Sequence, residues 1–327
     1  MDLSKIVELI KNSQQIKKKY LLHPTLEFFK QFGYKNESIY ASLGQDSAAI
    51  LPYQNSETLI LLTIDELSKP FLQSNPQGAG YSSLFVASDD IYACGGLPLA
   101  ACISIVAKNQ EELNMMLTGI NTASEMLNLP IVRGHTSIEN EPHLTISAMG
   151  TIEKNLFVSS GSAQENDVIA LIIDPQGEPS KTNCLYWNSI HERISHLKEK
   201  RRVIYLLSKA QCIHSSKDIS NAGIFGTLLQ MMELSNMGAR IEIEKIEIPS
   251  SLIQKRYQLE EYVQMYLTSS FIVSLDPEKI DKATKIVQDL DLHINIIGNV
   301  ISTKKIIIAK NNNTMDLFDF SKEKFIF

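Results

Sequence analysis

The chain has 327 residues, a formal net charge of −6 at pH 7 and a hydrophobic fraction of 44%. Such an acidic chain lacks the dominant basic surface that non-specific nucleic-acid binding requires. No apolar run reaches the roughly 18 residues of a membrane span, and polar side chains interrupt Met1–Tyr20 too often for a signal peptide. We therefore expect a cytoplasmic protein with no nucleic-acid or membrane partner.

Hydrophobic periodicity predicts mixed helices and strands along the first half of the chain. Residues 3–33 have helical spacing, and the basic run Lys17–Lys19 within them is either a solvated helix face or a phosphate contact. The elements expected next are a strand that starts near 42–52, a buried strand at 58–66, a helix at 80–96 that Gly95 and Gly96 end, a strand at 99–107, a helix at 109–128 and a strand at 143–154.

A polar, turn-rich stretch at 159–167 separates this half from a second α/β half. The second half is expected to contain a strand at 167–174, a helical region with Trp187, a segment at 201–211, a loop and helix at 215–239 capped by Gly238, a strand at 240–249, a helix at 276–290 and strands at 294–302 and 304–310. We predict an N-terminal domain at 1–155, a C-terminal domain at 165–310 and a polar, mobile tail at 311–327.

Several aspartates stand where apolar segments begin or end, namely Asp46, Asp65, Asp89 and Asp90. A charge at the edge of a core is unfavourable unless it is paired or bound to a metal. Converging carboxylates would repel one another, and hard oxygen ligands suit Mg²⁺, which typically also binds nucleotide phosphates. The alternative is that these residues are separate caps and surface carboxylates, and spacing alone leaves both open.

Two further segments could contact a phosphate. "VRGHTS" (132–137) places a bare glycine backbone and His135 at a strand end, or it forms a tight turn with a surface histidine. "SKDISNAGIFGT" (216–227) opens a helix with small residues, whose free N–H groups attract anions, or it is a capped helix packed on a neighbour. Walker, Rossmann, zinc-protease and nucleophile-elbow motifs do not occur, and the four cysteines form no CxxC pair.

Taken in order, these segments resemble the superfamily of aminoimidazole ribonucleotide (AIR) synthetase, thiamine-monophosphate kinase, selenophosphate synthetase and the hydrogenase-maturation carbamoyl dehydratase. The segments that carry the resemblance are "GQDSAAI", "LTIDELSKP", "VASDDIYACGGLPLA", "VRGHTS" and "KDISNAGIFGTLLQMMELSNMGARIEI". The resemblance runs from about residue 40 to residue 305. It is best with an uncharacterised AIR synthase-related branch that includes a methanogenesis-marker type.

The resemblance implies a two-domain α/β fold, with an N-terminal domain that dimerises through a β-barrel and a C-terminal α/β sandwich. It also implies ATP and Mg²⁺ as ligands. Carried over by position, it assigns metal binding to Asp46, Asp65 and Asp90, catalysis to Asp65 and Asp218, and nucleotide contacts to Thr63, Gly134, His135, Thr136, Lys217 and Asn221.

The sequence departs from that pattern at several positions. Gln45 replaces the first aspartate of a pair, His135 stands where thiamine-phosphate kinases carry an aspartate, and Leu97 replaces an arginine. A reactive cysteine near the N-terminus and a C-terminal cysteine are both missing, which disfavours selenophosphate synthesis and carbamoyl dehydration.

We expect a homodimer that uses ATP and Mg²⁺ to phosphorylate or activate an oxygen of a small metabolite, in an amide, carboxylate or phosphate. A nucleotide-binding protein without turnover and a structural dimer are the alternatives.

Overall fold

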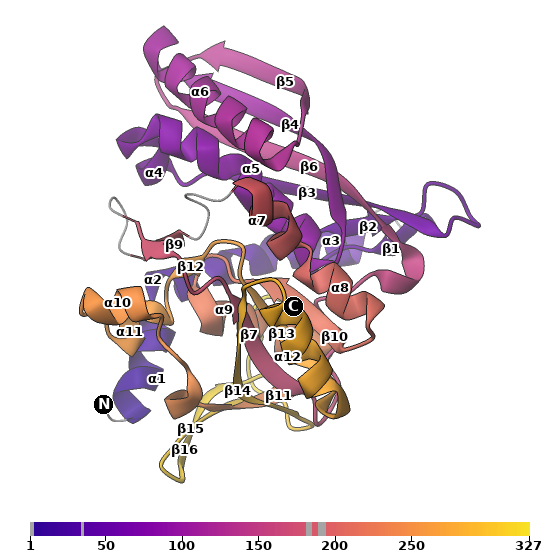
Figure 1. Cartoon of the computed structure of the whole chain (residues 1–327), viewed down its shortest axis with the longest axis vertical. Helices are drawn as coiled ribbons and strands as arrows, with labels where there is room; N and C mark the ends of the chain where they lie inside the picture. Colours follow the sequence, from indigo (N-terminus) through magenta and orange to yellow (C-terminus); the bar gives the residue numbers. More distant parts are fainter. Residues whose placement is uncertain (1–2, 34–35, 181–184, 189–193) are drawn as a thin grey trace.

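The computed structural model describes residues 3–33, 36–180, 185–188 and 194–327. A six-stranded sheet forms the centre of an N-terminal lobe, and a seven-stranded sheet forms the centre of a C-terminal lobe. The lobes are stacked along the long axis of the molecule, with the N-terminal lobe at the top of the view (Figure 1). This arrangement confirms the expected α/β class.

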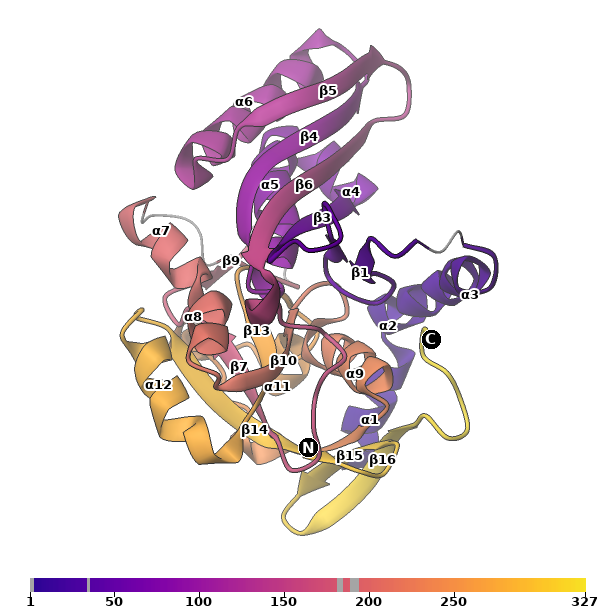
Figure 2. The same cartoon turned by 90° about the vertical axis from the view of Figure 1, so that its right-hand side faces the viewer.

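The sheet of the N-terminal lobe is open. Its strands, in spatial order, are β1 (Ile39–Ala41), β2 (Ala48–Ile50), β3 (Thr58–Glu66), β6 (His143–Glu153), β4 (Leu97–Ala107) and β5 (Ile131–Ile138). Only β4 and β5 pair in parallel. The helices α4 (Lys69–Ser74), α5 (Pro76–Ala93) and α6 (Gln110–Leu127) belong to the same lobe, and α5 and α6 lie together on one face of the sheet (Figure 2). Within the described parts of the chain, no helix covers the other face.

The helix α5 is buried along most of its length, and its sequence explains why. The Asn75 side chain accepts a hydrogen bond from the Gly78 N–H and Pro76 occupies the first turn, which together start the helix. Gly80 and Gly119 lack side chains where α5 and α6 touch, because a Cβ at either position would collide with the backbone of the other helix. Gly95, with a φ of +78°, ends the segment.

The sheet of the C-terminal lobe has helices on both faces. Its strands, in spatial order, are β10 (Ile213–Asp218), β13 (Phe271–Leu275), β7 (Val168–Ile173), β14 (His293–Ile301), β11 (Gly238–Glu242), β15 (Lys305–Lys310) and β16 (Asn313–Asp319). The helix α9 (Gly223–Ser235) packs into one buried cluster, while α8 (Val203–Lys209) and α12 (Ile280–Gln288) pack into another.

Shorter elements complete the described chain. A small sheet contains β12 (Tyr266–Leu267), β9 (Tyr186–Asn188) and β8 (Glu178–Pro179). Further α-helices are α7 (Ile194–Arg201), α10 (Ser250–Gln254) and α11 (Leu259–Tyr262). Single 3-10 turns cover Tyr20–Leu22, Lys154–Leu156, Ile243–Lys245 and Pro277–Lys279.

The first helices of the chain pack on the C-terminal lobe. They are α1 (Leu3–Asn12), α2 (Gln14–Lys19) and α3 (His23–Phe32). Leu3, Ile6 and Ile10 of α1 belong to the buried cluster of that lobe, and α1 lies beside β15 and β16. We call residues 3–32 the N-terminal arm.

Several local predictions are wrong. Trp187 lies in β9 and not in a helix, because this three-residue strand depends on pairing with the distant β12. Gly238 begins β11, and α9 instead ends at Ser235 with Asn236, whose φ is +56°, as its C-cap. The "VRGHTS" segment lies within β5, so it is neither a strand end nor a turn.

The C-terminal residues also differ from the expected mobile tail. Residues 313–319 form β16, which pairs with β15, and the Phe325 and Ile326 side chains are buried. The Glu233 carboxylate of α9 accepts hydrogen bonds from the backbone N–H groups of Phe325, Ile326 and Phe327. These backbone bonds and buried side chains attach the end of the chain to the C-terminal lobe.

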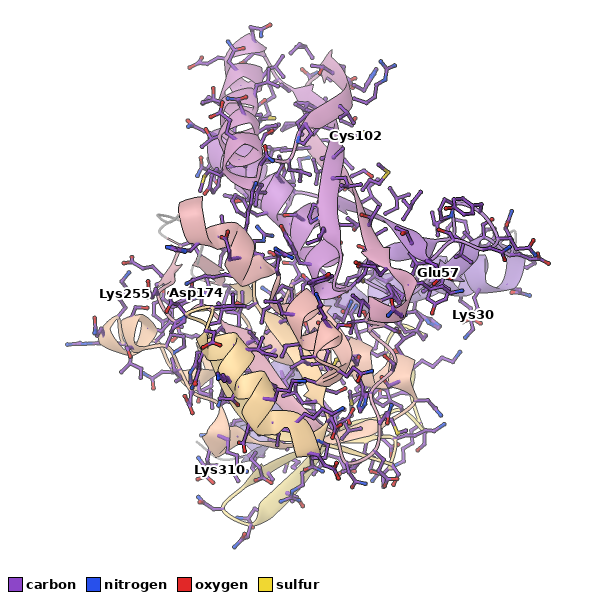
Figure 3. All side chains as sticks on the ribbon, turned by 45° about the vertical axis from the view of Figure 1, so that its right-hand side comes forward. Lys30, Glu57, Cys102, Asp174, Lys255 and Lys310 are labelled. Carbon is purple, nitrogen blue, oxygen red and sulfur yellow. The ribbon has the colours of Figure 1, made fainter. Side chains whose placement is uncertain are left out.

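Three cysteines lie among the described residues, and all three are free thiols. Cys94 and Cys212 are buried free thiols, and Cys102 is a half-buried free thiol on β4 (Figure 3). Cys184 lies outside the described residues. Within the described chain, none of the helices combines the length and apolarity needed to cross a membrane.

Candidate functional site

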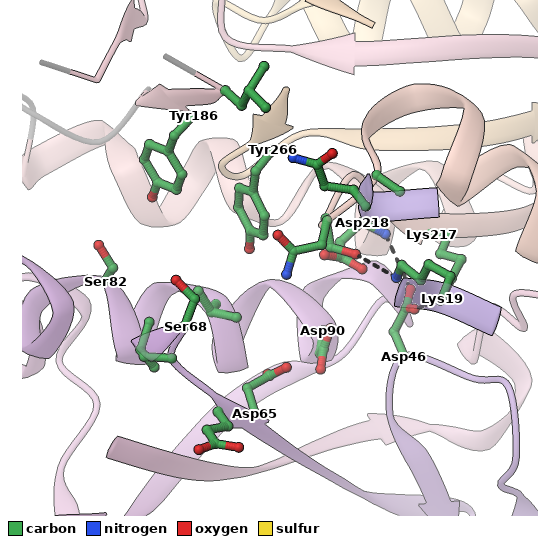
Figure 4. Close-up of a pocket in the computed structure, with 18 of the residues that line it drawn as sticks. Lys19, Asp46, Asp65, Ser68, Ser82, Asp90, Tyr186, Lys217, Asp218 and Tyr266 are labelled. Carbon is green, nitrogen blue, oxygen red and sulfur yellow. Dashed lines mark hydrogen bonds and ion pairs between the residues drawn. The ribbon is translucent and has the colours of Figure 1, made fainter. Parts of the chain in front are cut away.

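A cavity of about 330 Å³ lies where the two lobes and the N-terminal arm meet. Charged side chains, among them Lys19, Asp46, Lys217 and Asp218, gather at one end, which we call the ionic end (Figure 4). Tyr186 and Tyr266 stand at the other end, which we call the aromatic end.

The ionic end brings together aspartates that are far apart in the sequence. Asp46 comes from the turn between β1 and β2, Asp90 from α5, and Asp218 from the last position of β10. One oxygen from each of these carboxylates lies within 4.8 Å of the others. Two of the four aspartates singled out by their places beside apolar segments, Asp46 and Asp90, therefore converge with Asp218, whereas Asp89 is paired with Arg201.

Asp65 and Thr63 reach the same cluster because of the register of β3. Alternate side chains of a strand point to the same face, so Thr63 and Asp65 share the helix-covered face with the buried Leu61. The Thr63 hydroxyl donates a hydrogen bond to Asp90 Oδ2. The Asp65 carboxyl lies close to that of Asp90, and Asp65 Oδ2 is buried without a hydrogen-bond partner among the described residues.

Burial and mutual repulsion disfavour the charged forms of these aspartates. Burial raises the pKa of Asp65 to about 6, and the Asp46 carboxylate adds to the shift. Burial also raises the pKa values of Asp90 and Asp218 well above their usual range, with neighbouring carboxylates reinforcing both shifts. A bound cation would remove this repulsion, and an all-carboxylate donor set suits Mg²⁺. The residues present thus fit the ion that the sequence analysis expected.

Two lysines reach the ionic end from different parts of the chain. Lys217 of β10 forms a buried ion pair with Asp46, whose Oδ2 also accepts a hydrogen bond of 3.2 Å from the Asp218 N–H. Burial lowers the pKa of Lys217, but the Asp46 and Asp218 carboxylates outweigh it and the net shift is upward. Lys19, the last residue of α2, lines the cavity as well, and burial together with Lys217 lowers its pKa.

The aromatic end was not found by sequence reasoning. The rings of Tyr186 and Tyr266 stack with centroids 5.3 Å apart and an interplanar angle of 14°. The Tyr266 hydroxyl is buried and has no partner among the described residues. Ser82 and Gln264 also line the cavity. These tyrosines lie on strands of two and three residues, which leave no periodic signal in the sequence.

The predicted nucleotide-binding residues divide into two groups. Thr63 contacts Asp90, while Lys217 and Asn221 line the cavity. Gly134, His135 and Thr136 lie on the edge strand β5 and are exposed. His135 pairs with Ser104, Ser104 pairs with Thr145, and Thr145 pairs with the cavity residue Glu66. His135 therefore lies three strands, or about 14 Å, across the sheet from Glu66. The structure therefore does not bring these β5 residues to the cavity of their own chain.

Gln45, the residue that departs from the superfamily pattern, has a local partner. Its Oε1 accepts a hydrogen bond of 2.8 Å from the Ser160 N–H, in the segment that connects the two lobes. The side chain beside Asp46 thus ties the turn between β1 and β2 to this connection.

The chain matches the family model described as "AIR synthase related protein, N-terminal domain" over residues 44–152 and the corresponding C-terminal domain model over residues 168–310. The chain belongs to the AIR synthase-related protein family. An uncharacterized protein of Methanocaldococcus jannaschii is 28% identical over 247 residues, which cover 75% of each chain. The N-terminal arm precedes both matched regions of this family member.

Solved structures of two relatives share the fold. PurL of Thermotoga maritima, complexed with ATP, has a TM-score of 0.74 at 12% identity and is matched over 93% of this chain and 51% of its own. This chain therefore spans about half the length of that PurL. ThiL, complexed with AMPPCP and TMP, has a TM-score of 0.64 at 18% identity over 91% of this chain and 95% of its own. At these identities the similarity concerns the fold alone.

Proposed function

We propose that this protein is an ATP- and Mg²⁺-dependent enzyme of the kinase or synthetase kind, acting on an oxygen of a small metabolite. The observation that carries the proposal is the convergence of Asp46, Asp90 and Asp218 in one cavity between the lobes. Their mutual repulsion favours a divalent cation, and phosphoryl transfer relies on such a cation beside the phosphates. The family and the nucleotide complexes of PurL and ThiL support the choice of ATP.

Each group at the ionic end then has a role. Asp46, Asp65 and Asp90 would hold Mg²⁺, which when bound offsets the negative charge of the phosphate oxygens. Thr63 orients Asp90, and Lys217 keeps Asp46 in place by their ion pair. Asp218 and Asn221 face the cavity from the C-terminal lobe, where Asn221 would contact the nucleotide.

The reaction transfers one phosphoryl group. The bond between the γ-phosphorus and the oxygen that joins it to ADP breaks, and ADP leaves with the electron pair of that bond. A new bond forms between the γ-phosphorus and the acceptor oxygen. A carboxylate or phosphate acceptor gives up no proton, whereas an amide acceptor releases an N–H proton, for which Asp218 at the cavity wall would be the base.

The aromatic end is the place for the acceptor molecule. Tyr186 and Tyr266 present aromatic surface, and Ser82 and Gln264 add polar groups beside them. Small-molecule sites commonly combine apolar walls with a few polar groups that fix orientation. An acceptor at this end would present its oxygen towards the ionic end of the same cavity.

We infer a homodimer through the uncovered face of the N-terminal sheet. Leu62 and Ile64 of β3 and Met149 of β6 are 44%, 70% and 40% exposed there, although they are apolar. Exposed apolar surface of this kind marks an interaction site. Facing two such sheets would form the expected β-barrel and would let His135 reach the cavity of the partner.

Sedimentation velocity of the wild type and an Ile64→Asp variant tests the dimer. We expect a wild-type dimer and a folded monomeric variant, because a buried unpaired carboxylate opposes association. A wild-type monomer at micromolar concentration would contradict the interface.

Calorimetric titration with AMPPCP, with and without Mg²⁺, tests the function itself. We expect binding that requires Mg²⁺ and that is lost in Asp65→Asn while thermal melting shows an intact fold. Hydrolysis of ATP should show the same dependence. Absence of nucleotide binding in both conditions would overturn the proposal, and full activity of Asp65→Asn would overturn the site assignment. Tight binding without turnover on any acceptor would favour the non-catalytic alternative.

A further inference from the structure

The N-terminal arm precedes the matched family regions and yet contributes to the cavity. Its α1 is anchored in the core of the C-terminal lobe. Its α2 packs against α9, where Ile16 is buried and Ile16 Cδ1 lies 3.3 Å from the position that a Cβ on Gly226 would take. Anchoring of both helices fixes the end of α2 at the ionic end of the cavity.

Because α2 is anchored in this way, its last residue, Lys19, lies at the ionic end of the cavity. Its Nζ donates long hydrogen bonds of 3.4 Å to Ser220 Oγ and 3.3 Å to Gln230 Oε1, which are both neutral acceptors. Among the residues that the structure describes, Lys19 forms no ion pair, whereas Lys217 is paired with Asp46. The preceding Lys17 and Lys18 are exposed to solvent. Lys19 is therefore held in the cavity without a direct ion-pair partner among the described residues, although carboxylates lie near it.

We propose that Lys19 contacts the terminal phosphate of ATP, so that the N-terminal arm completes the nucleotide site. This inference rests on the proposed function. Asp46, Asp90 and Asp218 mark the metal end of the cavity, and in phosphoryl transfer the metal lies at the β- and γ-phosphates. Lys19 faces the same end, so the terminal phosphate is the anion within its reach.

The change of hydrogen-bond partners on nucleotide binding favours the contact between Lys19 and the terminal phosphate. Lys19 would give up two weak bonds to neutral acceptors and would form charge-assisted hydrogen bonds to phosphate oxygens, which are roughly twice as strong. Ser220 and Gln230 would keep the ammonium group oriented before the nucleotide arrives. Lys19 forms no covalent bond and transfers no proton in this role.

Calorimetric titration of the full chain in Mg²⁺, with AMPPCP and separately with ADP, tests the inference. The variants are Lys19→Met, the conservative Lys19→Arg, and Lys18→Met as a matched control from the solvated side of α2. We expect Lys19→Met to weaken AMPPCP binding by at least about tenfold, the loss of a hydrogen bond to a charged group, and ADP binding by less than about twofold. Lys18→Met should change neither affinity, and Lys19→Arg should retain most of the AMPPCP affinity.

The outcomes separate this inference from the proposed function. A wild type that binds AMPPCP and a Lys19→Met variant that binds it equally well would overturn the role of Lys19 alone. Equal losses for AMPPCP and ADP would overturn the assignment to the terminal phosphate. A wild type that binds neither nucleotide would overturn both proposals. Thermal melting controls for folding, and Lys19→Gln carries the comparison if Lys19→Met does not fold.

Discussion

Asp89 and Asp90 are consecutive residues of α5, but Asp89 is paired with a cation while Asp90 faces other carboxyl groups. Asp89 is paired with Arg201, and the Ser269 N–H donates a hydrogen bond of 2.9 Å to its other oxygen. Asp90 faces the carboxyl groups of Asp46 and Asp218 at the ionic end. A buried carboxylate with a dedicated cation is satisfied within the fold, whereas a carboxylate that faces others needs a ligand.

The Arg201 pairing also positions the site. Arg201 Nη2 donates hydrogen bonds to Phe85 O at 3.0 Å and to Ser88 Oγ at 2.9 Å, and the guanidinium stacks over the rings of Phe85 and Tyr92. The side chains of Arg201 and Asp89 are 0% and 2% exposed. This contact anchors α5 along a side next to the one that lines the cavity, so Asp89 helps to fix the helix that presents Asp90.

Breaking the buried pair should have the largest effect. Arg201→Met leaves Asp89 buried without its cation, which we expect to lower the free energy of unfolding by about 3–5 kcal/mol. Thermal and urea melting measure the loss. Arg202→Met is the matched control, because Arg202 is exposed and its guanidinium stacks on the ring of Tyr205, so its change should stay within about 0.5 kcal/mol. Equal stability of the two variants would contradict the structural role of the pair.

Changing the neighbouring carboxylate should instead affect activity. Asp90→Asn removes one charge from the proposed Mg²⁺ site, and we expect Mg²⁺-dependent ATP hydrolysis to fall by about 100-fold. Melting in the absence of metal should show equal or greater stability, because the amide relieves repulsion from Asp65.

Asp89→Asn serves as the contrast and should destabilise the protein by weakening the partner of Arg201. If Asp90→Asn unfolded while Asp89→Asn remained stable, the structural role assigned to Asp89 and the functional role assigned to Asp90 would both be contradicted.

The pH dependence of the metal-free protein should report the unpaired carboxylates. The pKa of Asp65 rises from 3.8 to about 6 on folding, so the folded state binds its proton more tightly. The stabilising contribution is complete below pH 4 and is lost as the pH rises through 6, by about 3 kcal/mol. Melting of the wild type and Asp65→Asn from pH 4 to 7 in EDTA measures the difference, and Mg²⁺ should reduce it. Parallel curves would show that Asp65 does not titrate in this way.

Long, strongly patterned elements were predictable from the sequence, and short ones were not. The continuous apolar run of β3 and the 18-residue amphipathic α6 appear where periodicity placed them. The strands β9 and β12 have three and two residues and exist only because they pair with each other across the chain. Their tyrosines form the aromatic end, so that end of the cavity could not be read from local pattern.

At the ionic end too, some residues were predictable from the sequence and others were not. Asp46, Asp65 and Asp90 were identified because a charge beside an apolar run is unfavourable, and Asp218 was identified by resemblance. The sequence offered Lys17–Lys19 as a basic run, but only packing of α2 on α9 determines that Lys19 enters the cavity. His135 lies on the exposed edge strand β5 because of the order of the strands in the sheet, and the local sequence does not encode that order.

Substitution of Gln45 should change stability least among these variants. It also distinguishes whether Gln45 anchors the turn between β1 and β2 or binds the metal. Gln45→Ala removes the acceptor for the Ser160 N–H, so we expect a loss of about 1 kcal/mol in the free energy of unfolding. Mg²⁺ affinity, measured by calorimetry, should change by less than about twofold, because Asp46, Asp65 and Asp90 remain. Gln45→Glu keeps an acceptor for Ser160 and should preserve stability. If Gln45→Ala lost Mg²⁺ binding at unchanged stability, Gln45 would be a metal ligand. The glutamine that replaces the aspartate of the superfamily pattern would then act on the metal and not on the connection between the lobes.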